Sequence, residues 1–63
     1  MTHQDAPEKC SVGDFFTIAD DPEAFSGMDS PVEWTGPNGA TWRFEMIEVP
    51  CEGGTDFAWR RTL

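Results

Sequence analysis

The sequence has little positive charge, which argues against the usual way of binding nucleic acid. Lys and Arg number 4 against 12 Asp and Glu, so the 63-residue chain carries a formal net charge of −8. Affinity for a phosphate backbone comes largely from cationic contacts that release counterions. We therefore expect no direct contact with nucleic acid. A field of this sign attracts basic protein surfaces instead, although it also serves solubility.

Groups that carry enzyme chemistry are equally scarce. His3 is the only histidine, and the two cysteines, Cys10 and Cys51, lie far apart in the sequence. Zinc sites usually contain a closely spaced cysteine pair, so these residues with a carboxylate make a very weak metal pattern. Neither a complete calcium loop nor a phosphate-binding glycine motif occurs. Because the roles that catalysis requires are unfilled, we predict a non-enzyme without metal or cofactor.

Long apolar runs are missing as well, and none reaches the length of a membrane span. The polar start, residues 1–5, does not resemble a secretory signal. We therefore expect a cytoplasmic protein whose cysteines are thiols in a reducing compartment. A disulfide between them would close a long loop and add about 3–4 kcal/mol on the chain-entropy model. The sequence leaves that pairing open.

Aromatic residues are present in number, with three Trp and five Phe but no Tyr. A chain of this length forms one domain near the lower size limit, and large rings give it the most buried area per residue. The net free energy of folding of such a small domain is still low. Oligomerisation, for example as a homodimer, or partner binding would add to its stability.

Strand signals dominate residues 11–63, which we expect to form one small β domain after a flexible N-terminal arm of residues 1–10. Between the first two strands, Asp21, Pro22 and Gly27 fit the cap, first position and stop of one short helical turn. The apolar alternation changes phase near Met46, which predicts a bulge there, and Pro50 should end that strand. The predicted strands are residues 12–19, 32–35, 40–49 and 57–63.

The segment Gly36-Pro37-Asn38-Gly39 is the clearest turn signal in the chain. Pro and Asn suit the first two positions of a three-residue hairpin loop, and Gly suits the left-handed third. This loop places opposite each other residues whose numbers sum to 76. The resulting pairs are Trp34 with Trp42, Glu33 with Arg43, and Val32 with Phe44.

These elements predict a mostly β fold, a small antiparallel four-stranded meander with one short helical turn. A flat sheet would leave an aromatic face in water. We therefore expect the sheet to curl into an open barrel of SH3-like type. Packing of two sheets across a dimer is the alternative.

Acidic residues of the first half of the chain and one tryptophan are the candidates for a binding surface. Isolated carboxylates are costly to bury, so the acids should be exposed. Alternation predicts that the tryptophans are core residues, with Trp59, near the C-terminus, the most exposed of the three. Trp is also enriched among binding hot spots. The residues expected to contact a partner are Asp14, Asp20, Asp21, Glu23, Asp29, Glu33 and Trp59.

The leading functional hypothesis is a non-catalytic acidic module that binds a basic, nucleic-acid-binding surface of a partner protein. One form is an inhibitor that mimics DNA charge, by analogy with small acidic proteins of phages and mobile elements. Two alternatives stay open. One is a structural subunit of a homo-oligomer or larger assembly, and the other is a peptide-binding adaptor with a Trp-lined groove. Charge-driven association should weaken with salt, whereas apolar assembly should not.

Overall fold

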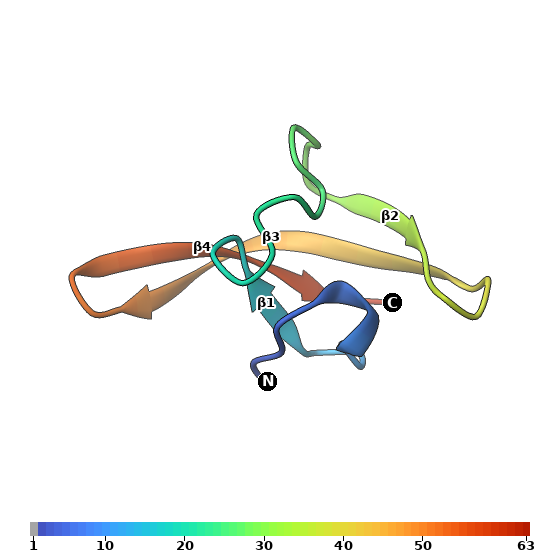
Figure 1. Cartoon of the computed structure of the whole chain (residues 1–63), viewed down its shortest axis with the longest axis horizontal. Coiled ribbons are helices and arrows are strands. Elements are labelled where there is room, and N and C mark those ends of the chain that lie inside the picture. The colour runs from blue at the N-terminus through green and yellow to red at the C-terminus, as the bar shows by residue number, and fades with distance from the viewer. Residues whose placement is uncertain (1) are drawn as a thin grey trace.

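A single four-stranded antiparallel sheet forms the frame of the protein (Figure 1). The computed structural model describes residues 2–63. Its elements are the 3-10 helix η1 (Pro7–Lys9) and the strands β1 (Phe15–Thr17), β2 (Val32–Thr35), β3 (Thr41–Cys51) and β4 (Gly54–Arg61). The predicted mostly β fold with four antiparallel strands is confirmed.

The order of the strands differs from the predicted meander, because β1 lies beside β4 and the sheet reads β1-β4-β3-β2. This order places Phe16 opposite Trp59, which in turn lies opposite Met46. Directly opposed residues share one face of an antiparallel sheet, so the order gathers large apolar side chains on that face. The sheet is neither closed nor strongly curled, and the expected SH3-like barrel does not form.

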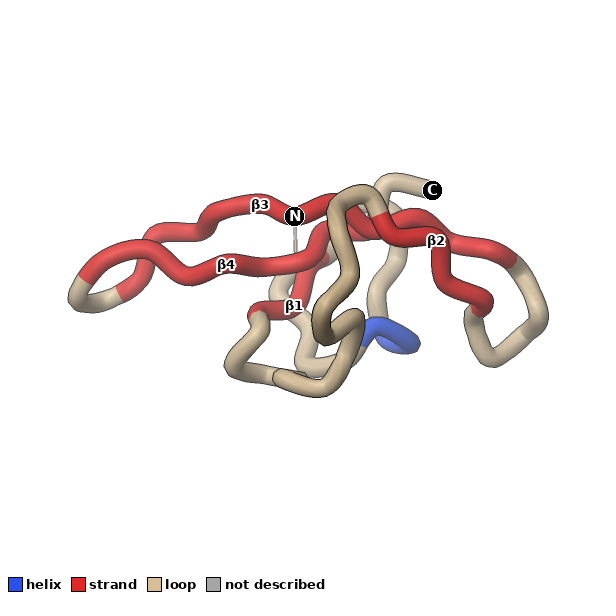
Figure 2. Tube along the Cα trace, turned by 90° about the horizontal axis from the view of Figure 1, so that it is seen from above, coloured by secondary structure: helices blue, strands red, loops and turns tan. Residues whose placement is uncertain are grey.

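Irregular segments, and not further strands of a barrel, cover the aromatic face of the sheet. The η1 region and the loop of residues 18–31 lie on the same side of the sheet (Figure 2). From that loop, the ring of Phe25 contacts the rings of Phe16, Trp34, Phe44 and Trp59, with centroids 5.1–6.2 Å apart. A loop with one deeply inserted ring therefore covers the aromatic face that a flat sheet would leave in water.

The short helical turn predicted around Asp21–Gly27 is absent there and is replaced by consecutive turns. Phe25 has a φ of 57°, which an α-helix does not allow. The left-handed conformation of Phe25 accompanies the insertion of its ring into the core. The prediction from Asp21 and Pro22 was wrong because packing of this ring overrides local capping signals.

The β2–β3 hairpin agrees with the predicted register. Val32 lies opposite Phe44, Glu33 opposite Arg43, and Trp34 opposite Trp42. The backbone N–H of Gly36 donates to the carbonyl of Ala40 at 2.8 Å, and Gly39 has a φ of 82°. The apolar pairs face the core and the charged pair faces solvent, as the alternation requires.

Replacement of Gly39 by alanine should lower the free energy of unfolding by about 1–2 kcal/mol, because a Cβ disfavours the left-handed backbone. An added Cβ would meet no atom within 4 Å, so the loss would be purely conformational. Gly39→Asn should cost less, since Asn tolerates this region. Urea unfolding of both variants measures the difference. Wild-type stability in Gly39→Ala would contradict the turn geometry.

The β3–β4 hairpin extends beyond the core as a two-stranded arm of residues 47–57 (Figure 1). We call this arm the ribbon. The register of the hairpin runs unbroken from Phe44 opposite Arg61 to Cys51 opposite Gly54. The predicted bulge near Met46 and the predicted strand end at Pro50 were therefore wrong. A bulge is unnecessary because Ile47 and Val49 are only half-buried, so the chain need not turn both apolar sets toward one core.

The N-terminal residues expected to form a flexible arm lie against the sheet. His3 forms a parallel bridge with Phe15, and Pro7 and Cys10 are buried. The guanidinium of Arg61 donates to the carbonyl of Cys10 at 2.9 Å, which ties this segment to β4. Burial and the nearby charge of Asp14 raise the pKa of the Cys10 thiol to about 11. Cys10 and the exposed Cys51 are both free thiols.

Candidate protein-binding site

The predicted partner-binding residues do not share one environment. Trp59 is only 2% exposed, so the expectation that it is the most exposed tryptophan was wrong. Its strand lies between β1 and β3, and Phe25 packs over its ring. The position of Trp59 near the C-terminus of the sequence does not reveal this burial. Four of the predicted acids are exposed (Asp20, Glu23, Asp29 and Glu33), and two are half-buried (Asp14 and Asp21).

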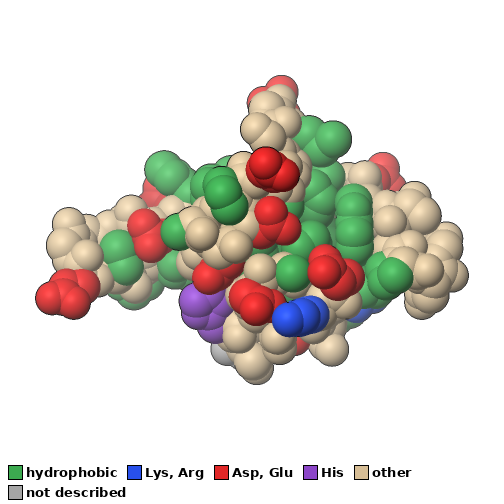
Figure 3. Space-filling view, viewed as in Figure 1, with side chains coloured by type: hydrophobic (Ala, Val, Ile, Leu, Met, Phe, Trp, Pro, Cys, Tyr) green, Lys and Arg blue, Asp and Glu red, His purple; other side chains and the backbone are tan. Residues whose placement is uncertain are grey.

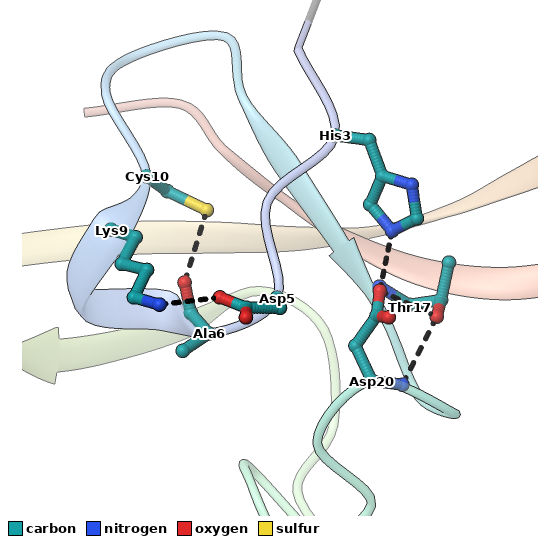
Figure 4. A network of polar contacts seen from close by, with 7 residues as sticks. All are labelled: His3, Asp5, Ala6, Lys9, Cys10, Thr17 and Asp20. Atoms are coloured by element: carbon teal, nitrogen blue, oxygen red, sulfur yellow. Dashed lines mark hydrogen bonds and ion pairs between the residues drawn. The ribbon is translucent and has the colours of Figure 1, made fainter.

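Two of these acids hold turns together. The Asp14 carboxylate accepts hydrogen bonds from the N–H of Ser11 at 3.0 Å and from the Gln4 amide at 3.5 Å. The Asp20 carboxylate accepts from the N–H and the hydroxyl of Thr17, at 2.9 and 2.8 Å, and is bonded to His3 (Figure 4). Both carboxylates therefore already have partners within the chain.

The bonds from His3 and from the Thr17 N–H lower the pKa of Asp20. A depressed folded-state pKa means that the ionised carboxylate stabilises the fold above its ordinary pKa of about 3.9. The contribution is lost as the pH falls through the lowered value. Asp20→Asn should therefore be less stable than wild type at about pH 7, and the difference should shrink between about pH 5 and pH 2.

Urea unfolding at several pH values measures this difference, with Asp29→Asn as the matched control. The Asp29 carboxylate is exposed and receives no hydrogen bond within residues 2–63. The control should remain near wild type at every pH. A stability difference for Asp20→Asn that stays constant with pH would contradict the assigned role.

Asp21 and Glu23 lie instead on a groove with an apolar floor. The groove has a volume of about 450 Å³ and is formed by the 18–31 loop, η1 and β2. Figure 3 shows acidic side chains gathered beside exposed apolar ones over the middle of the molecule. Its lining residues are Pro7, Asp21, Glu23, Ala24, Phe25, Met28 and Trp34. We call this feature the Trp34 groove.

Within residues 2–63, the carboxylates of Asp21 and Glu23 take part in no hydrogen bond or ion pair, in contrast to Asp5, which pairs with Lys9 at 3.0 Å. The groove floor includes Met28, which is 57% exposed, and the half-buried Trp34. The groove thus presents two unpaired negative charges beside apolar surface. A complementary ligand would be cationic with an apolar portion.

A second hollow, of about 400 Å³, is lined by His3, Gln4, Asp5, Lys9 and Asp20. Its side chains bond to each other, as His3 with Asp20 and Lys9 with Asp5 (Figure 4). The His3 ring also stacks on Phe15, with centroids 4.9 Å apart. Residues 2–63 contain no cluster of three or more His, Cys, Asp or Glu side chains suited to a metal ion. The contacts of His3 hold the N-terminal segment against β1 and the 18–31 loop, whereas Lys9 and Asp5 pair within that segment.

The sequence reasoning missed the apolar residues of the groove. Phe25 and Met28 are the two large apolar residues of the segment 20–31 between the first two predicted strands, and large apolar side chains in such a loop are a signal for packing or binding. Glu33 and Asp29, by contrast, do not line the groove. Glu33 lies opposite Arg43 on the sheet face that turns away from the core.

No protein family model, no curated protein and no solved structure matches the chain. Within residues 2–63, no helix has the length and apolar character needed to cross a membrane.

Proposed function

We propose that this chain is a non-catalytic binding module that engages a basic surface of a partner protein. The observation that carries the proposal is the Trp34 groove, where Asp21 and Glu23 stand unpaired beside an apolar floor. If the partner uses the same basic surface for nucleic acid, the module acts as its inhibitor by occupying that surface.

The binding energies of the two kinds of contact favour a groove over a diffuse acidic face as the binding site. An exposed ion pair contributes only about 0.2–1 kcal/mol, so scattered surface charges give little affinity. Buried aromatic anchors carry most of the energy in protein interfaces. The net charge of −8 accelerates the encounter with a basic partner, and the apolar floor supplies the attraction that persists after contact.

Charge reversal at the groove should abolish capture of basic partners. The double variant Asp21→Lys/Glu23→Lys is compared with the control Glu48→Lys/Asp56→Lys on the ribbon, which changes the net charge equally. All four side chains lie at half-buried or exposed positions, so both variants should fold. Each protein serves as bait in a native lysate, and bound proteins are identified by mass spectrometry.

We expect the wild type and the ribbon control to capture the same basic proteins at about 0.15 M salt, and the groove variant to lose them. Capture should also weaken steeply as salt rises. If both variants capture the same amount of partner, binding depends on net charge alone and the groove is not the binding site. Capture that does not change with salt would contradict charge-driven binding.

The ribbon favours a second candidate, a structural subunit of a homo-oligomer. Within residues 2–63, its outer half pairs with no further strand, and Phe57 is 52% exposed. Addition of a strand at this edge is disfavoured, however, because Pro50 has no N–H to donate and Glu48 is charged. Sedimentation velocity at low and high salt tests this alternative, which requires a dimer that persists in high salt.

A further inference from the structure

We infer that the Trp34 groove takes an arginine side chain of the partner protein, with its guanidinium against Trp34 and bonded to Asp21 and Glu23. This inference rests on the proposed function and adds the chemical group that is recognised. The aliphatic part of the arginine lies along the apolar floor, which includes Phe25 and Met28.

The chain itself shows how a guanidinium sits on a tryptophan of this pair. Arg61 places its guanidinium carbon 3.7 Å from the centroid of the Trp42 ring. Trp34 lies next to Trp42, with ring centroids 5.4 Å apart and an interplanar angle of 64°. Within residues 2–63, Trp34 has no such cation, although it lines a groove that carries two carboxylates. The partner supplies the missing cation.

The chemistry of the groove suits arginine better than lysine. A guanidinium is planar, weakly hydrated and carries five donors in a fixed arrangement, so it stacks on an indole while it bonds to a carboxylate. The ammonium of lysine is compact and strongly hydrated. Cation–π attraction between a guanidinium and an indole strengthens where water is excluded. The methylene stem of arginine also packs on apolar surface while its head stays hydrated.

The other acids do not offer this combination. Asp5, Asp14 and Asp20 are already bonded to groups of the same chain. Glu33 faces solvent opposite Arg43, away from the apolar floor. Among the predicted binding acids within residues 2–63, Asp21 and Glu23 thus combine unpaired charge with a neighbouring aromatic ring and apolar surface.

The test uses three acetylated and amidated heptapeptides, Gly-Ala-Leu-X-Leu-Ala-Gly, in which X is arginine, lysine or citrulline. Citrulline keeps the planar shape of arginine without its charge. Each peptide is titrated into the ¹⁵N-labelled protein, and the three tryptophan indole N–H signals are followed by NMR. We expect the Trp34 signal to shift saturably with the arginine peptide, while those of Trp42 and Trp59 move less.

Citrulline should weaken binding by about tenfold or more, and lysine should lie between the two. Asp21→Asn/Glu23→Gln should lose the shift, whereas Glu48→Gln/Asp56→Asn should keep it. Unchanged signals elsewhere in the spectrum show that each variant is folded.

Equal binding of the arginine and citrulline peptides, or no saturable shift of the Trp34 signal up to millimolar peptide, would overturn the inference. The proposed function would stand in that case if the groove variant still failed to capture basic partners. Conversely, arginine-selective shifts without partner capture would remove the proposed function and keep the binding chemistry of the groove.

Discussion

Replacement of Phe25 by alanine should unfold most of the protein at 25 °C, although Phe25 lies in a loop. The side chain is buried and its ring contacts four other aromatic rings of the core. Removal of a buried Phe costs about 3–5 kcal/mol. A core of this size rarely supplies more than about 3–5 kcal/mol in total. Loss of the near-UV circular dichroism signal and of a cooperative thermal transition would report the effect.

Replacement of Phe25 by glycine distinguishes the loss of the ring from the strain of the backbone. Phe25 has a φ of 57°, which glycine adopts without strain and alanine does not. Phe25→Gly should therefore be at least as stable as Phe25→Ala, by up to about 1–2 kcal/mol, the reverse of their order in ordinary strands. Ser26→Ala, at the exposed neighbouring position, is the control and should stay within about 0.5 kcal/mol of wild type. A Phe25→Ala protein that folds and unfolds cooperatively would contradict the role of Phe25 in covering the aromatic face of the sheet.

Replacement of Trp59 by alanine should be the most damaging of the three tryptophan truncations. Trp59 is 2% exposed in a strand that is paired on both sides, and its loss should cost about 3–5 kcal/mol. Trp34 is half-buried beside the groove, so less apolar surface is exposed when it is truncated. Trp34→Ala should lose clearly less stability and still unfold cooperatively.

Guanidinium unfolding of the two alanine variants ranks these effects. Because Trp59→Ala is expected to be largely unfolded, Trp59→Phe provides a measurable intermediate. The phenyl ring keeps part of the packing, so this variant should remain folded with a lowered midpoint. Greater damage from Trp34→Ala than from Trp59→Ala would mean that the sheet order is misplaced.

The sequence by itself determined the β2–β3 hairpin down to the pairing of single residues. Pro37, Asn38 and Gly39 specify the loop, and the alternation of Trp42, Arg43 and Phe44 leaves one register that keeps apolar side chains together. Both signals act between residues that are close in the chain. The exposure of most of the acids followed similarly from the cost of burying charge.

Only the tertiary structure decided which strand lies beside which and what covers the aromatic face. The pairing of β1 with β4 joins Phe16 to Trp59 across most of the chain, and no local signal encodes such a distant contact. The insertion of Phe25 replaces the expected helical turn, and the burial of Trp59 follows from its central strand. The Trp34 groove arises from the same packing, because its residues come from η1, the 18–31 loop and β2. Short-range preferences set each segment's own conformation, whereas burial of a few large rings selects how the segments meet.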